Sequence, residues 1–198
     1  MNKPVSEEMY VSVDVETAGP NPGQYSLLSI GACLVYEPER TFYVELKPVN
    51  EAMLPEAAEV HGLSLEYLIE RGLPPRQAME RFEAWLGSQI RSASLAYTRR
   101  RPVFVAFNAP FDWMFVDDYF HRFLGRNPFG HTALDIKAYY MGLAGVRWYE
   151  TSYKLLGARY LGPDHSLQHH ALQDAIDQAA IFRFLLDEAN RERKESHE

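Results

Sequence analysis

Alternating hydrophobic and polar residues predict a strand close to the start of the chain. Residues 10–16 read Tyr-Val-Ser-Val-Asp-Val-Glu, which places a valine at every second position. A period of two in β-branched residues is typical of a strand with one face against a core. Two further apolar runs, 27–36 and 41–47, are separated by only four residues. So short a connection predicts that these two strands form an antiparallel hairpin.

The remaining apolar spacing and turn residues predict alternating helices and strands. They indicate a helical stretch over residues 55–85 with breaks near Gly62 and Gly72, a strand over 102–107, a helix over 110–124, a strand over 132–136, short helices over 137–141 and 151–161, and a long helix over 171–189. The element order β-β-β-α-β-α-β-α predicts an α/β fold with a mixed five-stranded sheet flanked by helices.

Length and composition are those of one globular domain. The chain has 198 residues, of which 46% are hydrophobic and 24% charged, so we expect a single domain over residues 1–198, with a core at about 9–187 and a charged C-terminal tail. No apolar run approaches the roughly 20 residues of a membrane span, and residues 1–8 lack the apolar centre of a signal peptide. The single cysteine, Cys33, excludes an internal disulfide. We therefore expect a cytoplasmic protein without membrane association.

Two carboxylates end the first predicted strand. Asp14 and Glu16 lie two residues apart, so the alternation of a strand places both on one face, about 6.6 Å apart along the chain. Two such acids repel each other, and burying them is costly unless a cation neutralises them. The alternative is a strand end that leaves both acids in water. For the pair alone, the strand end that leaves both acids in water is the favoured interpretation.

Two more acids lie at predicted helix starts. Asp112 lies in the first turn of the helix after the fourth strand, where stabilisation of the helix dipole would also explain it. Asp174 lies near the start of the last helix, just after His169 and His170, where an exposed helix acid and a loop histidine are the plainer alternatives. Taken together, four carboxylates suit hard cations such as Mg²⁺ or Mn²⁺ rather than Zn²⁺, and they suit a two-metal site for phosphoryl transfer.

These segments resemble, in order and spacing, the motifs of the DEDDh branch of the 3′→5′ exonucleases. That family has a ribonuclease H-like fold and carries D-x-E on its first strand, N-x-x-F-D at a later helix start and H-x-x-x-x-D at the last helix. The chain matches all three, at Asp14 to Glu16, at Asn108 to Asp112 and at His169 to Asp174. The resemblance covers about residues 9–187, and the segments that flank the motifs look most like those of ribonuclease T.

The resemblance implies a function and a role for each matched residue. It implies a two-metal-dependent 3′→5′ exonuclease that hydrolyses phosphodiester bonds from the 3′ end of single-stranded RNA or DNA and releases nucleoside 5′-monophosphates. The implied ligands of the two Mg²⁺ or Mn²⁺ ions are Asp14, Glu16, Asp112 and Asp174. His169 would be the general base, since a neutral imidazole with an ordinary pKa near 6.5 can accept a proton from water. His170 is the alternative base if the last helix already includes it, but the family spacing favours His169. Asp177 is expected to be a solvent-facing helix residue.

Further residues would contact the substrate. Small residues after the first motif line the family's terminal-nucleotide pocket, and a glycine there lets a nucleotide approach the backbone. His61 could stack on the terminal base or be a partly buried histidine at a helix end. Phe111 could be a stacking wedge, although support of the core is the favoured role. The substrate-binding residues expected on these grounds are Thr17, Ala18, Gly19, His61, Asn108 and Phe111.

Charge and the rival functions complete the sequence-based interpretation. A net charge of −7 argues against a broad phosphate-binding surface. An enzyme that holds only a few terminal nucleotides needs little general affinity for phosphate, and two divalent ions would offset four of these charges.

An Asp-nucleophile phosphatase would need D-x-D where this chain has Glu16, and would leave His169 without a role. A non-catalytic nucleic-acid-binding module of the same fold is the remaining alternative, which the loss of a metal ligand would support. The expected partners are single-stranded 3′ ends and, by analogy with ribonuclease T and oligoribonuclease, a second copy in a homodimer.

Overall fold

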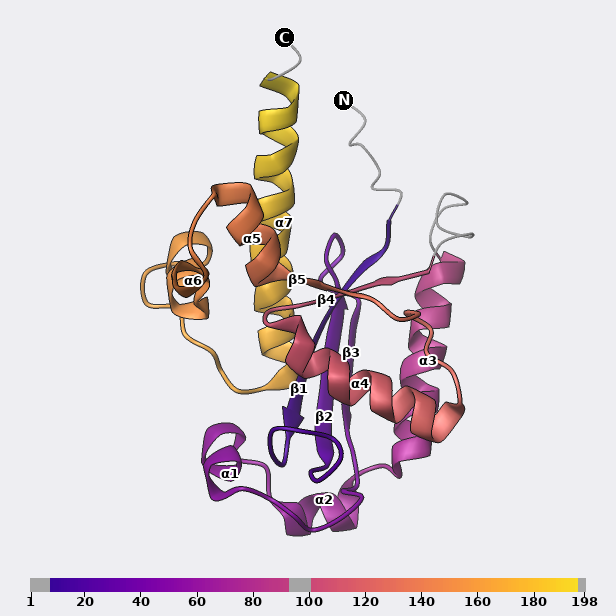
Figure 1. The fold of residues 1–198 in the computed structure, drawn as a ribbon. Helices are drawn as coiled ribbons and strands as arrows, with labels where there is room; N and C mark the ends of the chain where they lie inside the picture. The colour runs from indigo at the N-terminus through magenta and orange to yellow at the C-terminus, as the bar shows by residue number, and fades with distance from the viewer. Residues whose placement is uncertain (1–7, 93–100, 196–198) are drawn as a thin grey trace.

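A five-stranded mixed sheet lies at the centre of the computed structural model, which describes residues 8–92 and 101–195 (Figure 1). Its strands are β1 (Tyr10–Thr17), β2 (Leu27–Leu34), β3 (Thr41–Glu45), β4 (Val103–Ala106) and β5 (Ala133–Asp135). They lie in the order β3-β2-β1-β4-β5. β2 pairs antiparallel with β1 and β3, whereas β4 pairs parallel with β1 and β5. The predicted sheet, including its hairpin, is confirmed.

The helices follow the predicted order, with some different boundaries. The described helices are α1 (Pro55–His61), α2 (Leu65–Arg71), α3 (Pro75–Ser92), α4 (Ala109–Leu124), α5 (Ile136–Ala144), α6 (Tyr153–Tyr160), α7 (Ala171–Glu195) and the 3-10 helix η1 (Trp148–Thr151). The predicted breaks near Gly62 and Gly72 separate α1, α2 and α3, and α7 continues beyond residue 189. Among the described residues, no helix combines the length and the apolar character that a membrane span requires.

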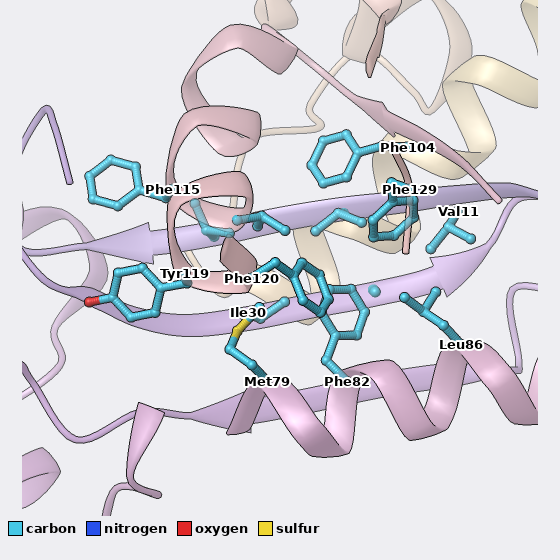
Figure 2. Close-up of a cluster of buried hydrophobic side chains, with 14 of the residues drawn as sticks. Val11, Ile30, Met79, Phe82, Leu86, Phe104, Phe115, Tyr119, Phe120 and Phe129 are labelled. Carbon is cyan, nitrogen blue, oxygen red and sulfur yellow. The ribbon is translucent and has the colours of Figure 1, made fainter. Parts of the chain in front are cut away.

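The helices cover the two faces of the sheet in separate layers. α3 and α4 pack on one face, and α5, α6 and α7 pack on the other. Figure 2 shows the core on the α3 and α4 side, where Phe82 and Phe120 lie against the strand that carries Val11. Val13 and Val15 point into the same core. Because side chains alternate along a strand, Asp14 and Glu16 share the opposite face of β1, as the sequence predicts.

A glycine lets the last helix lie directly on the sheet. Gly31 of β2 is the pairing partner of Asp14 in β1. A β-carbon at Gly31 would lie 2.2 Å from backbone atoms of Ala171 and Leu172, in the first turn of α7. Only a residue without a side chain permits this approach. The start of α7, which carries Asp174, therefore lies beside the end of β1.

Candidate active site

Carboxylates from distant parts of the chain meet where β1 ends. Asp14 and Glu16 come from β1, and Asp174 comes from the first turn of α7. One carboxylate oxygen from each of the three lies within 4.8 Å of the others. Glu16 and Asp174 are buried, and Asp14 is half-buried. The structure thus brings together three of the four predicted metal ligands.

Asp112 lies next to this group without being one of the three. It occupies the first turn of α4 and is buried. Its Oδ1 accepts a hydrogen bond from the backbone N–H of Val15, at 3.1 Å. Since Val15 separates Asp14 from Glu16, this bond holds the start of α4 against the end of β1. The fourth predicted ligand therefore lies at the same end of the sheet as the other three.

Burial and mutual repulsion raise the pKa of these acids. Burial is the largest cause for Asp14, and the charges of Asp112, Glu16 and Asp174 add to it. Burial, together with the charge of Asp174, raises the pKa of Glu16 to about 8. Burial also raises the pKa of Asp112 and of Asp174. Such a cluster resists full ionisation until a cation offsets its charge, and its oxygen donors fit a hard divalent cation.

Gln178 of α7 is a functional candidate that sequence reasoning missed. Its side chain is buried, and its amide oxygen accepts the backbone N–H of Phe107, just after β4, at 2.9 Å. Its amide nitrogen donates to Oδ1 of Asp14 at 2.5 Å. A usable signal was present, because Gln178 follows Asp174 by four residues and the two therefore share one helix face.

The two candidate histidines lie in the loop before α7 and have different surroundings. α7 begins at Ala171, so His170 is not part of the helix, and the condition that would favour it as the base is not met. The ring of His170 stacks on Tyr43 of β3, with ring centres 4.8 Å apart. His169 is exposed and has a positive φ of 52°. The preceding Gln168 donates its backbone N–H to Oδ1 of Asp174 at 2.9 Å, which ties this loop to the acid cluster.

A pocket of about 380 Å³ opens beside the carboxylates, and Glu16 forms part of its wall. The predicted substrate-binding residues that line it are Thr17, Gly19, His61 and Phe111. Ala18 does not line the pocket, because its side chain is fully buried in a small cluster with Leu28 and Leu68. Asn108 does not line it either, but is exposed at the start of α4 with a left-handed φ of 67°.

His61 and Phe111 both line the pocket and both also contact the protein interior. The ring of Phe111 lines the pocket and also packs on Phe115, with ring centres 5.6 Å apart. His61 is the last residue of α1, and its Nδ1 accepts the backbone N–H of Leu63 at 3.0 Å. Its Nε2 is buried and lies near the backbone of Thr17. Burial lowers the pKa of His61, and the charge of His169 adds to this effect.

Asp177, which the sequence places in solvent, is buried. Its carboxylate lies 2.9 Å from Nε2 of His165 and accepts a hydrogen bond from Gln173 at 3.0 Å. His165 also lies 3.2 Å from the hydroxyl of Tyr153 in α6. The expectation is wrong because the loop before α7 folds back over this turn of the helix, which helical spacing alone does not reveal.

Residues 11–182 match the exonuclease family RNase_T. The 3′-5′ DNA exonuclease Cap18 of Escherichia coli is 46% identical over 188 residues, which cover 95% of this chain and 96% of that protein. Ribonuclease T of Shewanella frigidimarina (strain NCIMB 400) is 31% identical over 189 residues, which cover 89% of this chain and 81% of that protein. The chain therefore belongs to this exonuclease family, as the motifs predict.

A solved structure agrees with the fold. The nuclease domain of 3′hExo, a DEDDh family member bound to rAMP, has a TM-score of 0.73 and covers 93% of this chain and 95% of its own, at 14% identity. At that identity the likeness establishes the ribonuclease H-like fold alone. Family membership, fold and acid cluster together define the chain as an enzyme, a 3′→5′ exonuclease of a class that uses divalent metals.

Proposed function

We propose that this chain is a two-metal-dependent exonuclease that removes nucleoside 5′-monophosphates from the 3′ end of single-stranded nucleic acid. The observation that supports this most directly is the group of Asp14, Glu16 and Asp174, whose oxygens lie within 4.8 Å of one another at the wall of a pocket of about 380 Å³. An acid cluster alone binds cations. A pocket beside it that can hold one nucleotide directs hydrolysis to the terminal bond.

The proposed metal ligands are Asp14, Glu16, Asp112 and Asp174, which would hold two Mg²⁺ or Mn²⁺ ions. When bound, two such ions supply positive charge to the attacking and leaving oxygens of an in-line displacement. The bond from Val15 to Oδ1 of Asp112 leaves the other Asp112 oxygen for this purpose. The raised pKa values of the cluster support this proposal, because buried acids that repel one another gain most from bound cations.

His169 is the proposed general base. A ring nitrogen of His169 takes a proton from the attacking water, whose oxygen bonds to the terminal phosphorus. The bond from that phosphorus to the 3′ oxygen of the preceding nucleotide breaks, and this oxygen takes up a proton from solvent. Two features support this role: the side chain is exposed beside the acid cluster, and its loop is tied to Asp174 through Gln168. His170 is less suitable because its ring is stacked on Tyr43.

The remaining proposed residues receive the terminal nucleotide. His61 and Phe111 form walls of the pocket, and the Thr17 hydroxyl, which donates to the Gly19 carbonyl at 2.9 Å, shapes the turn at its edge. Gly19 must lack a side chain, because a β-carbon there would lie 2.5 Å from the ring of Tyr25. We propose that Ala18 and Asn108 contribute by supporting this backbone and the start of α4 rather than by lining the pocket.

DNA is the proposed preferred substrate, because the 46% identical relative is named a DNA exonuclease and the ribonuclease is 31% identical. The test compares matched 3′-labelled single-stranded DNA and RNA, with Mg²⁺, with Mn²⁺ and with a chelator. The expected result is stepwise release of 5′-monophosphates, faster from DNA, and no release with the chelator or from Asp14→Asn. Rapid cutting of circular single strands, or full activity after exhaustive chelation, would contradict the proposed function.

Three further predictions stay proposals. The first is that residues 1–198 form a single exonuclease domain, which the family match over residues 11–182 supports. The second is a homodimer, suggested by the resemblance to ribonuclease T and testable by sedimentation. The third is a cytoplasmic location, consistent with a chain whose single cysteine, Cys33, is buried.

A further inference from the structure

Gln178 connects the end of β4 to the acid cluster through an amide whose orientation is determined by its neighbours. Its side chain is 1% exposed, and its oxygen accepts the N–H of Phe107 at 2.9 Å. The backbone N–H can only donate, so the amide oxygen must face Phe107. The NH₂ group must then face Asp14, to which it donates at 2.5 Å. The opposite orientation would pair two donors at Phe107 and two acceptors at Asp14.

This hydrogen bond acts on a carboxylate that has other acids close by. Three acids, Asp112, Glu16 and Asp174, repel the charge of Asp14, whereas the donor from Gln178 stabilises it. One Asp14 oxygen is held by this bond, so the carboxylate cannot rotate freely. Lone pairs remain on both oxygens of Asp14 for a cation.

The position of Gln178 on α7 adds a second constraint. Gln178 follows Asp174 by four residues, so one turn of α7 carries both a proposed metal ligand, Asp174, and the side chain that is hydrogen-bonded to a second proposed ligand, Asp14. The bond from Gln178 to Asp14 therefore joins α7 to β1 at the level of the cluster. Phe107 joins β4 to the same amide.

We propose that Gln178 is a positioning residue of the metal site, which holds Asp14 at the distance and orientation from Asp174 that a divalent cation requires. The inference rests on the proposed function, because it concerns how that metal site is assembled. Partners that orient metal ligands contribute about 10- to 100-fold to metal affinity or activity.

Gln178→Met tests the proposal, because methionine keeps an unbranched side chain of similar length and removes the donor to Asp14. The matched control is Gln173→Met on the same helix, where the lost bond is to Asp177, which is not a proposed ligand. The measurements are Mn²⁺ binding by calorimetry without nucleic acid, and kcat and KM on a single-stranded DNA oligonucleotide. Gln178→Met should bind Mn²⁺ about 10- to 100-fold more weakly and lose kcat with little change in KM. Gln173→Met should match the wild type in both measurements.

A second variant separates the bond to Asp14 from the bond to Phe107. Assayed with Mg²⁺ at a pH above about 8, the pKa of Glu16, Gln178→Glu keeps an oxygen that accepts the N–H of Phe107 but presents a carboxylate, instead of a donor, to Asp14. If Gln178 positions Asp14, kcat falls at least about 10-fold in this variant too. Wild-type kcat in Gln178→Glu, or wild-type Mn²⁺ affinity in Gln178→Met, would overturn the inference. Asp14→Asn distinguishes failure of the proposed function from failure of the positioning role. If Asp14→Asn stays active, the proposed function is wrong. If Asp14→Asn is inactive while Gln178→Met is fully active, only the positioning role is refuted.

Discussion

Adding one methyl group at Gly31 should disrupt the acid cluster without touching any acid. A β-carbon at this position would lie 2.2 Å from the carbonyl carbon of Ala171 and from the nitrogen of Leu172, whereas ordinary contacts are 3.4–4 Å. Both atoms belong to the backbone of α7, so no side chain can rotate away. In Gly31→Ala the first turn of α7 must therefore retreat from β2 by about 1 Å or more.

The magnitude follows from that displacement. Inserting a methyl group where backbone must move costs about 1–3 kcal/mol of stability, and each kcal/mol lowers the melting temperature of a chain of this length by about 2–4 °C. Asp174 lies in the displaced turn and moves away from Asp14 and Glu16, with which it forms the cluster. Mg²⁺ requires ligands at about 2.1 Å, so a shift of this size separates the ligands. A displacement of about 1 Å at a reacting centre can cost about 100-fold in rate.

The assay compares Gly31→Ala with Gly142→Ala. Gly142 lies inside α5, and apart from the neighbouring backbone of its own helix no described atom lies within 4 Å of an added β-carbon, so alanine there should preserve or slightly raise stability. The measurements are the melting temperature, Mn²⁺ affinity and kcat on single-stranded DNA. Gly31→Ala should lower all three, and Gly142→Ala none. Wild-type Mn²⁺ affinity and kcat in folded Gly31→Ala would refute the argument that this close approach assembles the site.

Three other predictions concern charge and proton transfer. Asp112→Asn should lower turnover at least about 100-fold yet raise the melting temperature in chelator. The asparagine amide oxygen can still accept the N–H of Val15, whereas a buried charge is removed. A melting temperature below that of the wild type would contradict this. His169→Ala should cost about 10²- to 10⁴-fold in rate and His170→Ala far less, as single-turnover assays at saturating metal can show. The reverse pattern would identify His170 as the general base. The folded-state pKa of Glu16, about 8, exceeds its ordinary value of 4.5, so the metal-free protein should lose stability as the pH rises between these values and regain it with Mg²⁺. Thermal unfolding across this range tests that sign, and a constant or rising midpoint in chelator would disprove it.

The sequence determined those features that depend on near neighbours. The period of two in β1 separates the valines from the acids, because successive side chains of a strand point to opposite faces. Short turns and helix-breaking glycines set the hairpin and the divisions between α1, α2 and α3 for the same local reason. The three acidic motifs, in order, also identified the family, since their spacing reflects a fold in which their elements meet.

The tertiary structure decided which side chains meet across long separations in the chain. Nothing near Gly31 in the sequence indicates that α7 lies on it, because the contact depends on the packing of a helix from the other end of the chain. The same packing buries Gln178 against Asp14 and covers Asp177 with the loop that carries His165. Helical spacing determines which residues share a face, but the burial of that face depends on what folds against it. The local pattern therefore predicted the carboxylates and the strand and helix ends that carry them, whereas their distances, their raised pKa values and the amide that holds Asp14 exist only in the folded chain.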